Sequence, residues 1–147
     1  MTRNEAREIM MQILYEIDAA KAIEKDETPD KKEVKAKATE LVTERLAGSH
    51  VERGTRLITA ILDNLDEIDG AINSCSKKWK TTRMPKVDLA IMRLATGEIR
   101  YDDDIPEAVS VNEAINLAKK FSTDSSAKFV HGVLGAVTKK ASETAAE

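Results

Sequence analysis

The chain has 147 residues, about the size of one typical domain, and 41% of them are apolar, which is enough for a buried core. With 23 basic and 26 acidic residues the formal net charge is −3, which excludes a histone-like polycation but not a local basic patch. One Trp, two Tyr, two Phe, 6 Gly and 3 Pro argue against β-sandwiches and barrels, which need many turns and β-forming residues. The composition therefore favours an all-α protein.

Apolar residues at steps of three and four predict three amphipathic helices in the first half of the chain. The first stripe runs from Ala6 to Ile17, and the second from Val34 to Leu46. A third stripe of about seven turns runs without a break from Val51 to Cys75. Residues 21–34, between the first two stripes, alternate in charge and include Pro29, as a solvated linker does.

The chain changes character around Trp79. The segment Lys77–Lys86 holds five basic residues and no acidic residue. Apolar stripes at 87–95, 111–121 and 129–137 then predict further helices. No alternating run is long enough for a strand, so we expect six or seven helices in an all-α bundle, grouped before and after Trp79.

Hydrogen-bonding side chains mark the expected helix starts. Thr2 or Asn4 suits the N-cap of the first helix. Ser110 and Glu113 have the spacing of a capping box, which predicts that a helix begins at Ser110. The run 123–126 offers another cap before the last helix.

No signature of an enzyme is found in the sequence, neither a phosphate-binding loop nor a dinucleotide or nucleophile motif. Cys75 is the only cysteine, so an intramolecular disulfide is excluded and a structural zinc site is not expected. We therefore expect no catalytic residue, no metal and no cofactor. No apolar run has the length of a signal peptide's core or of a membrane span, and a cytoplasmic protein without membrane contact is expected.

Basic residues next to aromatic residues favour a binder of single-stranded RNA. Arg3 and Arg7 are four residues apart and share one helix face. Lys128 lies with Phe121 and Phe129 near the turn between the last two helices, where cations can follow phosphates and a ring can stack on a base. Core packing of both phenylalanines and solvation of the lysines explain the same pattern, so the residues alone leave both interpretations open.

Several segments carry a family pattern when they are taken in order. They are ARE and QILY within 6–15, Ile68–Trp79, VDLAIMRLA at 87–95, DIP to LAK at 104–119, and KFVHGVL at 128–134. Together they resemble the NusB family of bacterial transcription antitermination factors. The resemblance covers nearly the whole chain in the right order, which makes the ordered set far more specific than any one piece.

The resemblance implies an all-α, NusB-like bundle of two three-helix subdomains within one RNA-binding domain, residues 1–147. The expected N-terminal sub-bundle covers about residues 1–76 and the C-terminal one about residues 77–141. A frayed tail is expected at 142–147.

The resemblance also implies a function without covalent chemistry. A member of this family binds the boxA element of nascent ribosomal RNA jointly with the ribosomal protein NusE, and the pair joins an RNA polymerase complex that resists termination. Carried over by matching positions, the RNA-binding residues are Arg3, Arg7, Phe121, Lys128 and Phe129, and the NusE-binding residues are Asp88 and Tyr15.

Some positions depart from the family pattern. Asn4 and Glu5 interrupt an arginine-rich opening, and Ser122 replaces a glycine, which lowers the expected RNA affinity. Gly97 stands at a usual tyrosine position inside a helix, and His131 replaces an asparagine. The alternative function is a helical protein-interaction module, including a homodimer that masks the RNA face. An accessory domain of a ribosomal RNA methyltransferase ranks last.

Overall fold

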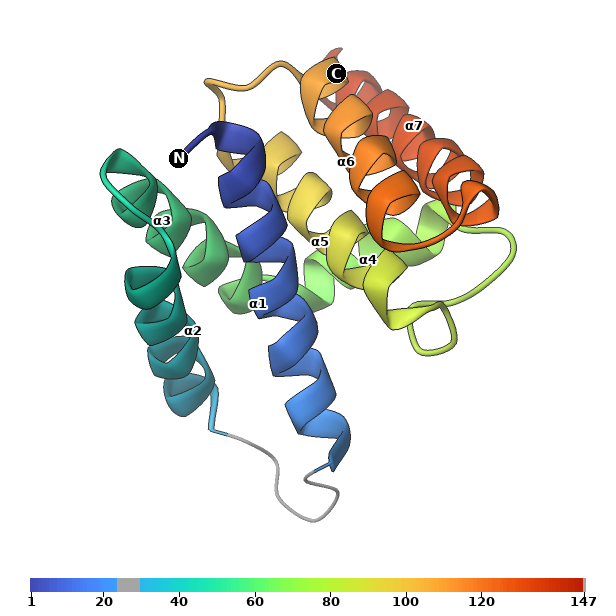
Figure 1. The fold of residues 1–147 in the computed structure, drawn as a ribbon. Coiled ribbons are helices and arrows are strands. Elements are labelled where there is room, and N and C mark those ends of the chain that lie inside the picture. The colour runs from blue at the N-terminus through green and yellow to red at the C-terminus, as the bar shows by residue number, and fades with distance from the viewer. Residues whose placement is uncertain (24–29, 147) are drawn as a thin grey trace.

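The computed structural model describes residues 1–23 and 30–146, with side chains for 1–20 and 30–141. In these ranges the chain forms seven helices and no strand, which confirms the all-α prediction (Figure 1). The helices are α1 (Arg3–Ile23), α2 (Lys31–Arg45), α3 (Ser49–Asp63), α4 (Leu65–Cys75), α5 (Lys86–Tyr101), α6 (Glu107–Phe121) and α7 (Asp124–Ala146). None of these helices is long and apolar enough to cross a membrane.

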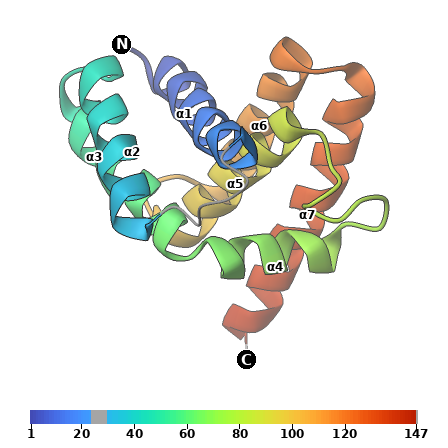
Figure 2. The same ribbon diagram turned by 90° about the horizontal axis from the view of Figure 1, so that it is seen from below.

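Helix α5 lies at the centre of the bundle. It packs against α1, α3, α4, α6 and α7, and every residue from Asp88 to Glu98 is buried. In Figure 1, α2 and α3 form a pair on one side of α1 and α5, and α6 and α7 form a pair on the other. Figure 2 shows α4 passing below the bundle beside α7. Because α5 is buried on all sides, it has neighbours on all sides. It therefore joins the α2–α3 pair to the α6–α7 pair.

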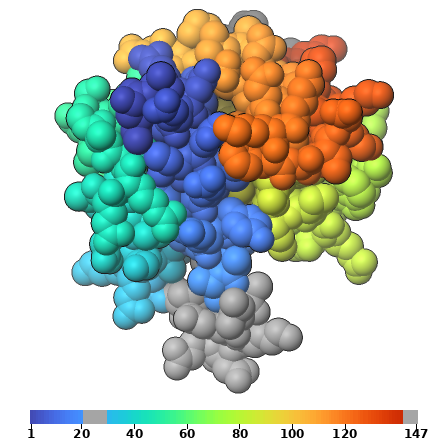
Figure 3. Space-filling model, viewed as in Figure 1, coloured from blue at the N-terminus to red at the C-terminus, as the bar shows by residue number. Residues whose placement is uncertain are grey.

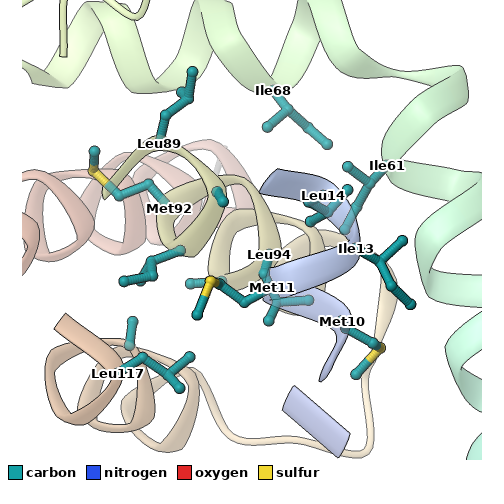
Figure 4. Packing of buried hydrophobic residues seen from close by; sticks show 14 of the residues in the cluster. Met10, Met11, Ile13, Leu14, Ile61, Ile68, Leu89, Met92, Leu94 and Leu117 are labelled. Atoms are coloured by element: carbon teal, nitrogen blue, oxygen red, sulfur yellow. The ribbon is translucent and has the colours of Figure 1, made fainter. Parts of the chain in front are cut away.

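The core is built from the apolar stripes of the sequence. Figure 4 shows Leu14 of α1, Ile61 of α3 and Leu94 of α5 among its buried side chains. Gly97 has a specific task here, because a Cβ at this position would lie 2.4 Å from Cγ1 of Ile61. Glycine at this position lowers the helix propensity of α5, but the absence of a side chain lets α3 and α5 approach closely.

The expectation of one unbroken helix over residues 51–75 is wrong. The chain leaves helical geometry at Asn64, which has φ −120° and ψ 28° and separates α3 from α4. The side-chain amide of Asn64 donates to the carbonyl of Ala60 over 2.8 Å and satisfies one end of α3. The apolar stripe runs through the break because both helices face the same core, so the periodicity does not reveal it.

The cap predictions have mixed outcomes. Thr2 caps α1, and its partner is Glu5: Oγ1 of Thr2 accepts from the N–H of Glu5 (3.1 Å), and the Glu5 carboxylate accepts from the N–H of Thr2 (3.2 Å). The expected cap of α7 is also confirmed, since Oγ1 of Thr123 accepts from the N–H of Ser126.

The capping box at Ser110 is wrong. Helix α6 begins earlier, at Glu107, because Pro106 precedes it with a φ of −59° that suits a helix start. Ser110 is thus buried inside the first turns of α6, and its hydroxyl has no hydrogen-bond partner among the described residues.

The expected linker is shorter than residues 21–34. Helix α1 reaches Ile23, and α2 begins at Lys31 with Asp30 as its cap, whose side chain accepts from the N–H of Lys32. Residues 24–29, with Pro29, lie outside the described residues, as does residue 147 of the expected frayed tail. The backbone of α7 continues to Ala146. The division into sub-bundles at residues 76 and 77 stays a prediction.

Candidate nucleic-acid interface

The two predicted RNA-binding arginines of α1 lie in different environments. Arg3 is exposed at the start of the helix. Arg7 is only 4% exposed, and its Nε lies 3.0 Å from each carboxylate oxygen of Glu98 in α5. Its Nη1 donates to Oδ1 of Asn4 over 2.8 Å. The guanidinium of Arg7 therefore ties α1 to α5, and its burial argues against the direct RNA contact expected from the sequence.

The Arg7–Glu98 pair also changes what the departures near the N-terminus mean. Asn4 is a hydrogen-bond partner of Arg7, and Glu5 completes the cap of α1. Both residues that interrupt an arginine-rich opening thus fix the first turn of the helix. Burial raises the pKa of Glu98, and this effect outweighs the opposing influence of Arg7.

The second predicted group lies at the turn between α6 and α7. Phe121 and Phe129 are both half-buried and pack against the core, which leaves part of each ring exposed. Nζ of Lys120 lies 5.3 Å from the centroid of the Phe121 ring. Lys128 is exposed and forms no ion pair with any residue that the structure describes. The two phenylalanines therefore combine the alternatives that the sequence left open, since each is part of the core and part of the surface.

A shallow groove runs between α6 and α7 beside this turn. It encloses about 480 Å³ and is lined by Ile115, Lys119, Asp124, Ala127, Lys128 and His131. Two of its cations, Lys119 and Lys128, are exposed, and Asp124 is the one acidic side chain in the lining. The groove offers a mixed apolar and basic surface between the two helices that this turn joins.

The start of α1 and the α6–α7 turn share one face of the molecule. In Figure 3 the N-terminal residues and the residues of α6 and α7 are visible on the same side. Nζ of Lys120 lies 2.6 Å from Oε1 of Glu8, which joins the end of α6 to α1. Arg3 precedes Glu8 by five residues, or about 7.5 Å along a helix axis. The start of α1, with Arg3, and the α6–α7 turn, with Lys128, are therefore neighbouring segments of one surface.

The two predicted partner-binding residues, Tyr15 and Asp88, differ in exposure, as Arg3 and Arg7 do. Tyr15 on α1 is 39% exposed and is accessible to a partner. Asp88 in the first turn of α5 is fully buried, and neither carboxylate oxygen has a hydrogen-bond partner among the described residues. The N-terminal end of a helix favours a carboxylate, and Pro85 at the cap has no N–H to donate to it. In the free chain the carboxylate of Asp88 is thus not accessible, and its contact with a partner stays a prediction.

Sequence reasoning missed two neighbours of these residues. Glu98 was not identified as the partner of Arg7, although a carboxylate among the apolar residues of α5 signals a buried counter-ion. Trp79 was used to divide the chain and as part of the family pattern, but its packing was not predicted: its ring meets the Phe129 ring edge-on with centroids 5.0 Å apart. In the described part of the chain no three His, Cys, Asp or Glu side chains gather as metal ligands do.

Comparisons with known proteins agree on one family. The NusB family model matches residues 4–139. The transcription antitermination protein NusB of Clostridium botulinum (strain Loch Maree / Type A3) is 41% identical over 140 residues, which are 92% of this chain and 98% of that protein. The structure of T. maritima NusB matches with a TM-score of 0.78 and 31% identity, over 95% of this chain and 92% of the other. A crystal structure of the antitermination factors NusB and NusE in complex with double-stranded RNA contains a chain with the same fold, with a TM-score of 0.73 and 24% identity over 94% and 96% of the two chains.

Proposed function

Because this chain belongs to the NusB family of transcription antitermination proteins, we propose that it is an RNA-binding antitermination factor rather than an enzyme. In this proposal it acts in the cytoplasm, binds the boxA element of nascent ribosomal RNA together with NusE, and joins the RNA polymerase antitermination complex. A NusB chain of this fold occurs with NusE and RNA in a solved complex, which supports the choice of both partners.

One observation carries the RNA face of this proposal. The exposed cation Lys128 and the half-exposed Phe129 are neighbours at the start of α7, which follows the half-exposed Phe121 at the end of α6. Figure 3 shows α6, α7 and the start of α1, which carries the exposed Arg3, on one side of the molecule. Cations on such a surface bind phosphates, and rings that the core holds in place stack on unpaired bases. Arg7 contributes by fixing the start of α1 against α5, so that Arg3 is presented on this face.

The NusE contact is proposed at Tyr15, which is exposed on α1 two turns beyond Glu8. Asp88 acts from below the surface, where its buried carboxylate shapes the first turn of α5. Each partner then brings its own cations to the RNA, so a chain with a net charge of −3 still binds a polyanion within the complex.

The test is a titration of labelled boxA RNA with and without NusE at several salt concentrations. Arg3→Gln with Lys128→Gln should reduce affinity by about fivefold per lost phosphate contact at about 0.1 M salt, and reduce the salt slope by about 0.7 per contact. The control, Lys31→Gln with Arg56→Gln, removes the same charges from exposed positions on α2 and α3.

Equal RNA binding by the two double variants would contradict the proposed face. The mass of the free protein and of the RNA complex, measured by light scattering, addresses the alternative function. A homodimer that persists when boxA RNA is added would support a protein-interaction module instead.

A further inference from the structure

The connection between α4 and α5, residues 76–85, is the most basic segment of the chain, and we call it the α4–α5 loop. With Lys86 at the start of α5, it presents five exposed cations and no acidic residue. The cations are Lys77, Lys78, Lys80, Arg83 and Lys86. The antitermination role proposed above uses none of them.

The loop is held by its own hydrogen bonds. Oδ1 of Asn73 accepts from the N–H of Thr81 over 2.8 Å, and the Ser76 hydroxyl donates to the carbonyl of Trp79. The N–H of Met84 donates to the carbonyl of Lys80 over 3.0 Å, and the Met84 side chain is only 2% exposed. The cations therefore extend from a fixed backbone, which lowers the entropy lost when they bind a ligand.

Most of these cations have no counter-ion. The side chains of Lys77 and Arg83 form no ion pair with any residue in the described ranges, and Nζ of Lys80 has only a long contact of 3.4 Å with the carbonyl of Asn73. Lys78 lies over the Trp79 ring, with Nζ 4.2 Å from its centroid. Lys86 is the one of the five with an acidic partner among the described residues, since its Nζ lies 3.7 Å from Oδ2 of Asp18. Most of the positive potential of the loop is thus not cancelled within this part of the chain.

The α4–α5 loop continues the proposed RNA face. The edge-to-face contact of Trp79 with Phe129 seats the loop against the first turns of α7, next to Lys128. Figures 1 and 2 both show the loop beside the end of the bundle where α6 turns into α7. A single-stranded RNA whose base stacks on the Phe129 ring can therefore continue to Lys78 and its neighbours, and the loop holds no acidic residue to repel it.

We propose that the α4–α5 loop is a second phosphate-binding surface, which holds the single-stranded RNA that flanks the boxA segment. Lys77, Lys80 and Arg83 contact successive phosphates, and the contacts depend little on base sequence. This inference rests on the proposed function, because it places the flanking RNA beside the same Phe129.

An RNA backbone fits the loop better than an acidic protein does. Protein interfaces rely on apolar or aromatic anchors in a well-packed centre. The only aromatic side chain of the loop, Trp79, is already covered by Lys78 on its face and is in contact with Phe129. Spaced cations without an exposed anchor suit a row of phosphates.

The experiment compares a boxA RNA of about 8 nucleotides with the same RNA extended by about eight uridines at either end. The wild-type chain, with NusE present, should bind one extended RNA more tightly than the short RNA. In the triple variant Lys77→Gln, Lys80→Gln, Arg83→Gln this gain should vanish, and the salt slope for the extended RNA should fall by about 2. Lys78 is left unchanged because it packs on Trp79.

The matched control is Lys31→Gln, Lys32→Gln, Arg56→Gln, which removes two lysines and one arginine from exposed positions on α2 and α3. It should keep the gain from the extension, and both triple variants should keep the wild-type melting temperature. A loop variant that retains the full gain, or a wild-type chain that gains nothing from either extension, would overturn the loop proposal while short-RNA binding still upholds the proposed function.

Two further outcomes separate the proposals. If the wild-type chain binds the extended RNA but not the short one, and the loop variant abolishes this, the loop binds RNA and the boxA proposal fails. If the loop variant weakens NusE binding without RNA and leaves RNA binding unchanged, the loop is a protein contact and our inference is wrong.

Discussion

The α1–α3 side of the molecule and the side formed by the α4–α5 loop and the α6–α7 turn use their cations differently. On the first side Lys35 pairs with Asp63 (2.8 Å) and Arg45 with Glu16 (2.7 Å). On the second side Lys120 pairs with Glu8 (2.6 Å) and Lys86 with Asp18 (3.7 Å). The side chains of Lys77, Arg83 and Lys128 there have no acidic partner among the described residues. A balanced net charge of −3 thus conceals an uneven arrangement. What distinguishes the α4–α5 loop is that it holds no acidic residue and lies against the Phe129 ring, not the number of its cations.

The buried pair of Arg7 and Glu98 is where this contrast should have its largest effect. Arg7→Ala leaves a buried carboxylate without its counter-ion and should lower the free energy of unfolding by about 3–5 kcal/mol. Removing Arg45, whose pair with Glu16 is largely exposed, should cost about 1 kcal/mol or less. Urea denaturation of both alanine variants measures the difference, and equal losses would refute a structural role for the Arg7 pair.

A double variant separates structure from RNA binding at the same position. Arg7→Met with Glu98→Leu replaces the ion pair by apolar side chains of similar size, a change that is often neutral for stability. Because Arg7 is buried, we expect this variant to bind boxA RNA with NusE about as well as the wild type does. A drop in RNA affinity at unchanged stability would restore Arg7 to the RNA-binding set.

Substitutions on the side formed by the α4–α5 loop and the α6–α7 turn should lower RNA affinity more than stability. Phe129→Leu keeps an apolar side chain against Trp79 but removes the ring that a base can stack on. The loss of RNA affinity should be about 1–3 kcal/mol, while stability should change by less than about 1.5 kcal/mol. Gel-shift titration and thermal melting of the same sample distinguish the two, and a variant that only melts earlier would assign Phe129 to the core alone.

The sequence predicted the positions of the helices better than the contacts between side chains of different helices. The apolar stripes located the helices because burial imposes a period of 3.6 residues, and they failed at Asn64, where the stripe continues through a change of helix axis. Arg7 was predicted to bind RNA with Arg3 because their spacing on one helix face is visible in the sequence, whereas its contact with Glu98 spans 91 positions. Asp88 was named as a partner-binding residue, but its burial was not foreseen, since the sequence does not show that α5 is covered on every side.

The smallest effect we predict is the dependence of stability on pH at Glu98. Burial raises the pKa of this carboxyl above its ordinary value of 4.5, so between these two values the folded chain keeps a proton that the unfolded chain releases. Stability contributed by Glu98 is therefore greatest at low pH and decreases as the pH rises through this interval. The measurement is the difference in unfolding free energy between the wild type and the Arg7→Met, Glu98→Leu variant from acidic to neutral pH. This difference should fall as the pH rises and then level off. If the difference rises with pH instead, the attraction of Arg7 for the Glu98 carboxylate exceeds the cost of burying it, and the pKa of Glu98 is lowered, not raised.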